Sequence, residues 1–242
     1  MSGTHEQRTR RIVQKVHVAP LWSVAFGVFG LAAIGWFSTL SVAGWGAGLI
    51  YLVCSNAFLT SGLRRSETAR FGPANAATEV RSTLVGLITA LVATSFNAPI
   101  SVPLLIGLTV PALVLDAVDG WIARRTHTTS GLGARFDMEV DAFLLLVLSA
   151  YVAQDLGWWV IVIGALRYVF VAAAWVLPWM AATLPPRYWR KVVTAVAGIG
   201  LTIAASGLMP GGADVLVTLL ALALLVESFG RDVFWLLRRR PR

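Results

Sequence analysis

Charged side chains are scarce in this sequence. Asp, Glu, Lys and Arg together make up only 13% of the 242 residues, whereas hydrophobic residues make up 57%. A soluble domain usually carries about 25% charged residues. The shortage of charge therefore excludes an ordinary soluble globular protein, and we expect an all-α protein whose helices cross a membrane several times.

Cysteine is nearly absent as well. Cys54 is the single cysteine of the chain, so no disulfide can form within it. Cysteine usage therefore does not indicate the compartment. The formal net charge of +8 would suit a nucleic-acid-binding protein, but the positions of the basic residues favour a different explanation.

Apolar runs of membrane-crossing length follow one another along the chain. A helix needs about 20 apolar residues to cross a bilayer. We expect eight such helices. Seven of them lie at about 20–37, 42–62, 75–96, 100–124, 133–153, 158–178 and 213–236. The remaining one begins within the segment 179–191, which is a loop and helix start, and ends at about 206. The first run follows a basic tail, as in a signal peptide, but it is long for one and a second span follows at once, so we expect it to be retained.

Lys and Arg occupy alternate connections between these runs. The basic segments are 1–19, 63–70, 124–135, 187–191 and 237–242. The connections without any Lys or Arg are 38–41, 97–100, 154–157 and 207–214. Because basic residues stay on the cytosolic side of a membrane, this alternation predicts both termini in the cytosol. The basic charge then reflects topology and contact with anionic lipid headgroups rather than nucleic-acid binding.

Four aspartates are concentrated between residues 116 and 141. Asp116 and Asp119 are spaced i,i+3, and Asp137 and Asp141 are spaced i,i+4. Either spacing places both side chains on one face of a helix, so we expect two helix ends to meet, each with a carboxylate pair. The residues expected in the bend between them are Gly120, Arg124 and Gly133.

Carboxylates at a membrane boundary have three common explanations. They line an ion or proton pathway in a transporter, they pair with arginine for structural reasons, or they bind a metal for chemistry. Four carboxylates at helical spacing repel one another, which favours a hard divalent cation such as Mg²⁺, Mn²⁺ or Ca²⁺. We find no convincing internal repeat of the kind that many transporters contain.

The same stretch resembles the signature of the CDP-alcohol phosphatidyltransferase family, D-x2-D-G-x2-A-R-x8-G-x3-D-x3-D. All eight fixed positions match, and they are Asp116, Asp119, Gly120, Ala123, Arg124, Gly133, Asp137 and Asp141. The resemblance covers about 74–236 and implies a six-helix core of the phosphatidylglycerophosphate or phosphatidylinositol phosphate synthase kind. Residues 20–62 would then be two additional helices, with basic tails at 1–19 and 237–242.

This resemblance implies a reaction and its cofactors. A phosphatidyl group would pass from CDP-diacylglycerol to an alcohol, with release of CMP and with two Mg²⁺ or Mn²⁺ ions bound. Asp116, Asp119 and Asp137 are the expected ligands, and Asp141 is the expected general base and a further ligand. The resemblance also implies a homodimer in the cytoplasmic membrane with its active site at the cytosolic face.

The resemblance extends to the two substrates. The expected CDP-binding residues are Gly120, Ala123, Arg124, Gly133, Asn75 and Thr78, although helix capping also explains an Asn or Thr near a helix start. Arg81 belongs to the same polar pattern.

Arg167 and Lys191 are the expected acceptor-binding residues, and they favour an anionic acceptor such as glycerol 3-phosphate or inositol phosphate. Arg187 and Arg190 fit either this site or cytosolic anchoring. Ala142 departs from the lysine that many phosphatidylglycerophosphate synthases carry there, so a different acceptor alcohol stays open. A different CDP-linked donor is a further alternative, and the intact motif argues against a catalytically idle homologue that serves as a membrane scaffold.

Overall fold

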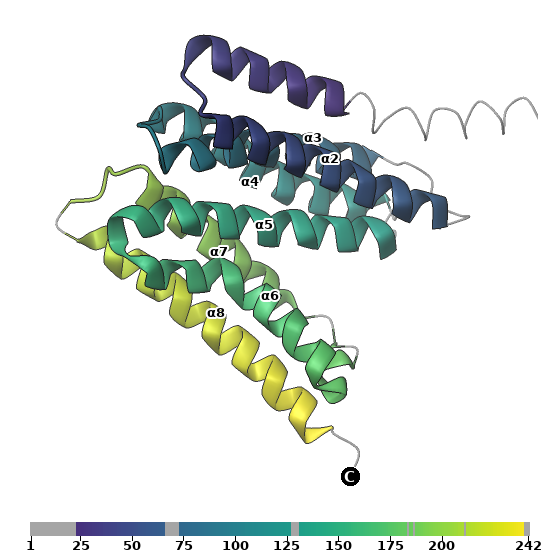
Figure 1. The fold of residues 1–242 in the computed structure, drawn as a ribbon. Helices are drawn as coiled ribbons and strands as arrows, with labels where there is room; N and C mark the ends of the chain where they lie inside the picture. The colour runs from purple at the N-terminus through teal and green to yellow at the C-terminus, as the bar shows by residue number, and fades with distance from the viewer. Residues whose placement is uncertain are drawn as a thin grey trace, which may run out of the picture. The chain divides into compact units, whose positions relative to one another are not determined.

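The described part of the chain is α-helical throughout. The computed structural model describes residues 23–65, 73–126, 131–182, 184–185, 187–210 and 212–239 (Figure 1). Within these ranges, the side chains of 62–65, 73–76, 119–126 and 131–132 are outside the description. The chain divides into two compact units, residues 1–140 and 141–242, and each is described by itself.

The first unit contains four complete helices and the start of a fifth. They are the helix Ser23–Phe37, α2 (Val42–Arg65), α3 (Pro73–Ser95), α4 (Val102–Thr126) and the beginning of α5 (Gly131–Leu156). Short turns with local caps separate the helix Ser23–Phe37 from α2, and α3 from α4: the Ser41 hydroxyl accepts a hydrogen bond from the Gly44 N–H and so caps α2. These turns lie where the sequence predicts the uncharged connections.

α3 is the central helix of this unit. It packs against both α2 and α4. Its apolar stretch, Ala77–Ser95, is 72% buried. Small residues allow the close approach. A Cβ added at Gly44 would lie 2.7 Å from the Ala90 carbonyl oxygen, and one added at Gly86 would lie 2.9 Å from Leu52 Cδ2. This is the small-residue packing typical of membrane helices.

The second unit contains the rest of α5, α6 (Ile161–Val176), α7 (Tyr188–Ala205) and α8 (Ala213–Arg238), with 3-10 turns at Trp158–Val160 and Pro178–Ala181. α8 contacts both α6 and α7. α6 crosses α5 in backbone contact, because a Cβ added at Gly164 would lie 2.2 Å from the Leu146 Cα. Gly157 (φ +102°) and Gly207 (φ +65°) adopt left-handed conformations in the turns after α5 and α7.

The composition and these helices confirm an all-α membrane protein. Within the described ranges, four helices are long and apolar enough to cross a bilayer: Val42–Ser61, Ala77–Ser95, Trp158–Val176 and Ala213–Arg238. Ser23–Phe37 and Val102–Val118 are shorter apolar segments. The predicted total of eight crossings and the predicted orientation stay predictions. The tail 1–19 and residues 240–242 lie outside the described residues.

One local expectation is wrong. We expected Gly120, Arg124 and Gly133 in a bend, but α4 continues to Thr126 and α5 already begins at Gly131. All three residues therefore lie inside helices. A glycine in a helix interior costs only about 1 kcal/mol relative to alanine, which helix packing overrides.

Candidate functional site

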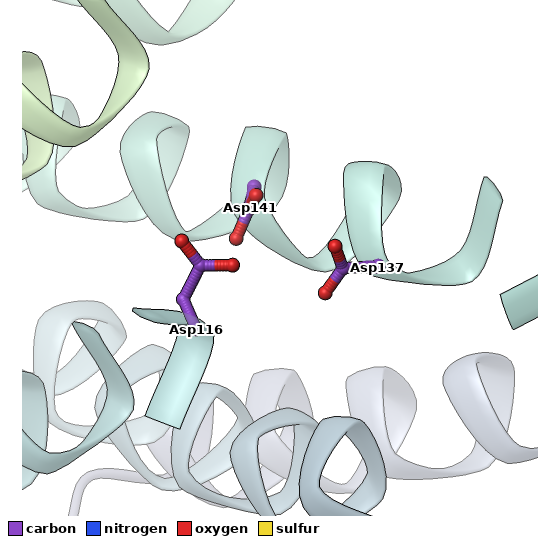
Figure 2. A group of neighbouring side chains, drawn as sticks. All are labelled: Asp116, Asp137 and Asp141. Atoms are coloured by element: carbon purple, nitrogen blue, oxygen red, sulfur yellow. The ribbon is translucent and has the colours of Figure 1, made fainter. Parts of the chain in front are cut away.

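Three of the four motif aspartates come together in space. Asp116, Asp137 and Asp141 each offer one carboxylate oxygen, and these three oxygens lie within 4.8 Å of one another. Figure 2 shows Asp137 and Asp141 on consecutive turns of α5, with Asp116 rising toward them from α4. α5 is one continuous helix across the boundary between the units, so its i,i+4 spacing fixes Asp137 and Asp141 on one face.

A buried arginine bridges two of these carboxylates. The Arg81 side chain is fully buried on α3, and its Nη1 donates a hydrogen bond of 2.5 Å to Asp116 Oδ1. Its Nη2 donates to Asp137 Oδ1 and also to the Asp137 carbonyl oxygen, the latter at 3.2 Å. The planar guanidinium suits this geometry, because its N–H groups form a fixed fork that can hold two oxygens at once.

The closeness of the carboxylates favours a bound cation. The Asp116 and Asp137 side chains are only 36% and 30% exposed, and Asp141 lies beside them. Like charges held this close in a partly dry site are costly unless a counter-ion neutralises them. A divalent cation would relieve this repulsion, and a second ion would also have Asp119 as a candidate ligand.

The spacing of the oxygens fits a hard cation. Oxygens that share an octahedral Mg²⁺ lie at most about 4.2 Å apart, and those around Ca²⁺ at most about 5.2 Å, as their bond lengths dictate. The observed limit of 4.8 Å is thus compatible with a shared ion after small side-chain rotations. A carboxylate has two oxygens, so contact with Arg81 through Oδ1 does not prevent Asp116 from binding metal through Oδ2.

Several predicted donor-binding residues are placed only by their backbone. Gly120, Ala123 and Arg124 lie in the last turns of α4 and Asn75 in the first turn of α3, while their side chains and that of Asp119 lie outside the description. Gly133 lies near the start of α5. Thr78 is buried on α3, three residues before Arg81 and therefore on the same side of the helix.

The predicted acceptor residues belong to the second unit. Arg167 is partly buried in the middle of α6, and Lys191 is exposed in the first turn of α7. Their role in acceptor binding stays a prediction. Arg167 nevertheless is a charged residue inside an apolar span, which is a functional hypothesis by default.

Arg187 and Arg190 lie beside the same acidic side chain. Arg187 Nη1 lies 3.6 Å from Asp232 Oδ1, and Arg190 Nε lies 3.5 Å from Asp232 Oδ2. Asp232 is almost fully buried on α8. Arg190 also donates to the Pro185 carbonyl oxygen. These contacts connect the start of α7 to the end of α8.

Sequence reasoning missed the parts played by Arg81 and Asp232. The sequence places Arg81 in the polar start of its helix and does not connect it with the aspartates. The available signal was a charge near the start of a helix long and apolar enough to cross a membrane, since such a charge needs a partner. Asp232 carried a similar signal near the end of the last apolar run.

Comparison with known protein families shows to which family the chain belongs. The family model described as CDP-alcohol phosphatidyltransferase matches residues 71–227, well over half of the chain. The chain belongs to this family. No curated protein and no solved structure matched in the same comparisons.

Family membership settles the general activity. This phosphatidyltransferase is a membrane enzyme that transfers a substituted phosphate group from a CDP-alcohol to an alcohol acceptor in phospholipid synthesis. The matched segment contains α3, α4 and α5, and hence Arg81 and every motif aspartate. It begins after α2, so the first two helices precede it.

Proposed function

We propose that the enzyme transfers the phosphatidyl group of CDP-diacylglycerol to a polyol phosphate such as glycerol 3-phosphate or inositol phosphate, with release of CMP. The observation that carries the proposal is the convergence of Asp116, Asp137 and Asp141 from two helices. The donor's lipid tails can remain in the bilayer while its pyrophosphate reaches these carboxylates at the cytosolic interface.

The carboxylates provide the binding site for Mg²⁺ or Mn²⁺. Asp116, Asp119, Asp137 and Asp141 are the proposed ligands of two ions, and hard oxygen donors are the ones these metals prefer. Bound metal would neutralise the pyrophosphate and polarise the phosphate under attack. Arg81 holds Asp116 and Asp137 in place through its buried contacts.

Asp141 is the proposed general base. It accepts the proton of the acceptor hydroxyl as that oxygen forms a bond to the lipid-linked phosphorus. The bond between this phosphorus and the oxygen of CMP breaks, and CMP leaves with the electron pair. Gly120, Ala123, Arg124, Gly133, Asn75 and Thr78 are the proposed contacts of the CDP portion.

The acceptor assignment rests on positive charge in the second unit. Arg167 and Lys191 would bind the phosphate of the acceptor, because guanidinium and ammonium groups form strong charge-assisted hydrogen bonds with phosphate oxygens. The proposal also includes both termini in the cytosol, a homodimer, and a six-helix core at 74–236 that follows two added helices.

A panel of acceptors tests this proposal. The purified enzyme is supplied with labelled CDP-diacylglycerol, Mg²⁺ or Mn²⁺, and one of glycerol 3-phosphate, inositol 1-phosphate, inositol, serine or a second phospholipid. We expect a labelled product and CMP with one of the two polyol phosphates. Product with only an uncharged acceptor would contradict the acceptor assignment and leave the phosphatidyl transfer intact.

A further inference from the structure

Three consecutive residues of α3 face three different neighbours. Arg81 points to the aspartates of α4 and α5. The Ser82 hydroxyl lies 3.3 Å from the Tyr51 hydroxyl on α2, and the Thr83 hydroxyl lies 3.1 Å from the Ser23 hydroxyl on the first helix. Successive helical residues are about 100° apart around the axis, since 3.6 residues make one turn. A single turn of α3 therefore contacts both preceding helices and the aspartate cluster.

Close packing limits movement of α3 against these two helices. A Cβ added at Gly48 of α2 would lie 3.0 Å from Ala90 on α3 and 3.0 Å from Leu31 on the first helix. A Cβ added at Gly30 of the first helix would lie 3.0 Å from Leu87 on α3. The three helices therefore approach one another without room for an additional methyl group, and their relative register is well defined.

We propose that the helix Ser23–Phe37 and α2 position Arg81 and thereby set the metal affinity of the aspartate cluster. This goes beyond the proposed function and rests on its metal site. Both helices precede residue 71, where the family match begins, so the contribution comes from a part of the chain outside the matched segment. Tyr51 and Ser23 are the positioning residues that act through Ser82 and Thr83.

The geometry predicts that a displacement of α3 weakens metal binding. Arg81 holds one carboxylate of α4 and one of α5 with a rigid fork, and a displacement of about 1 Å is enough to lose such directional contacts. When α3 is displaced, the carboxylates that Arg81 held together repel one another and separate. A divalent cation then no longer finds their oxygens at a common binding distance, so its binding is weakened.

A pair of glycine variants on α2 tests the proposal. Gly48→Leu forces α2 away from α3, whereas Gly46→Leu adds the same side chain where a Cβ would meet no atom within 4 Å. The dissociation constant of Mn²⁺ is measured by electron paramagnetic resonance of free Mn²⁺, with the purified full-length protein in lipid nanodiscs. The melting temperature of the metal-free protein is measured in parallel. We expect Gly48→Leu to weaken Mn²⁺ binding about tenfold, and Gly46→Leu to leave it unchanged.

Removal of the two hydroxyl contacts gives a milder variant that retains the packing. The double variant Tyr51→Phe and Ser23→Ala should weaken Mn²⁺ binding about threefold, which is the order expected for losing modest hydrogen bonds. Ser61→Ala is the control, because the exposed Ser61 hydroxyl donates its hydrogen bond to the Ala57 carbonyl oxygen of its own helix. Its Mn²⁺ affinity should equal that of the unmodified protein.

The possible outcomes distinguish a failure of the positioning role from a failure of the metal site. Variants that melt at lower temperature but bind Mn²⁺ as tightly as the unmodified protein would show that the first two helices only stabilise the fold, and would overturn the proposal. If Gly48→Leu does not fold, the double variant decides. Failure of the unmodified protein to bind Mn²⁺ would overturn the metal site and the positioning role together.

Discussion

Replacing Arg81 removes a cationic contact that two motif aspartates share. Arg81→Met keeps a long, flexible apolar side chain of similar reach but leaves Asp116 and Asp137 without their shared guanidinium. Arg81→Lys keeps the charge. However, a single ammonium is a compact point charge and does not reproduce the planar fork that spans two carboxylates.

The expected cost follows from burial. Breaking a buried ion pair by removing one partner costs about 3–5 kcal/mol of unfolding free energy. The Arg81 side chain is fully buried, but those of Asp116 and Asp137 are 36% and 30% exposed, so water partly relieves the unpaired carboxylates. We therefore expect about 3 kcal/mol for Arg81→Met, and about 1–2 kcal/mol for Arg81→Lys, which loses one hydrogen bond to a charged group.

The assay combines stability and turnover. Thermal unfolding in detergent without added metal reports the free-energy loss, and CMP release reports the effect on the site. Arg231→Met is the matched control, because Arg231 is 65% exposed and its ion pair with Glu227 is an i,i+4 contact, worth about 0.3–0.5 kcal/mol. If Arg81→Met unfolds and turns over like this control, the buried bridge contributes nothing and the reasoning is refuted.

Three further substitutions probe other parts of the account. Asp141→Asn should lower kcat by about 10²–10⁴-fold while CDP-diacylglycerol still binds, since it removes a base without changing shape; a rate near that of the unmodified enzyme would exclude Asp141 as the base. Arg167→Ala should raise the KM of the acceptor at least tenfold and more than that of the donor, and the opposite pattern in initial-rate kinetics would move Arg167 to the donor side. Gly164→Leu should destabilise the protein by more than about 3 kcal/mol through overpacking, because its Cβ would lie 2.2 Å from the Leu146 Cα. Gly230→Leu, where a Cβ meets no atom within 4 Å, should melt like the unmodified protein.

The helices and the motif aspartates were predictable from local patterns. Hydrophobic run length located each helix to within a few residues, because the length of an apolar run is a property of the sequence alone. The i,i+4 spacing of Asp137 and Asp141 likewise placed both on one helical face before any packing was known.

Contacts between distant segments were not predictable in the same way. Arg81 is 35 residues from Asp116 and 56 from Asp137, and only the packing of α3 against α4 and α5 decides which charges meet. The bend expected at Gly120 was wrong for a related reason. Helix propensity penalises glycine modestly, and tertiary contacts decide whether the helix continues.

The central claim is that the aspartate cluster performs metal-dependent phosphatidyl transfer. It is tested most directly by CMP release from CDP-diacylglycerol, with the acceptor panel present, before and after chelation of divalent metal, for the unmodified enzyme, Asp116→Ala and Asp155→Asn. Asp155 is an exposed carboxylate at the far end of α5 and serves as the control. We predict acceptor-stimulated release that chelation abolishes, that Asp116→Ala lacks and that Asp155→Asn retains. Release that is indifferent to chelation, or that persists in Asp116→Ala with the same metal requirement, would contradict the account.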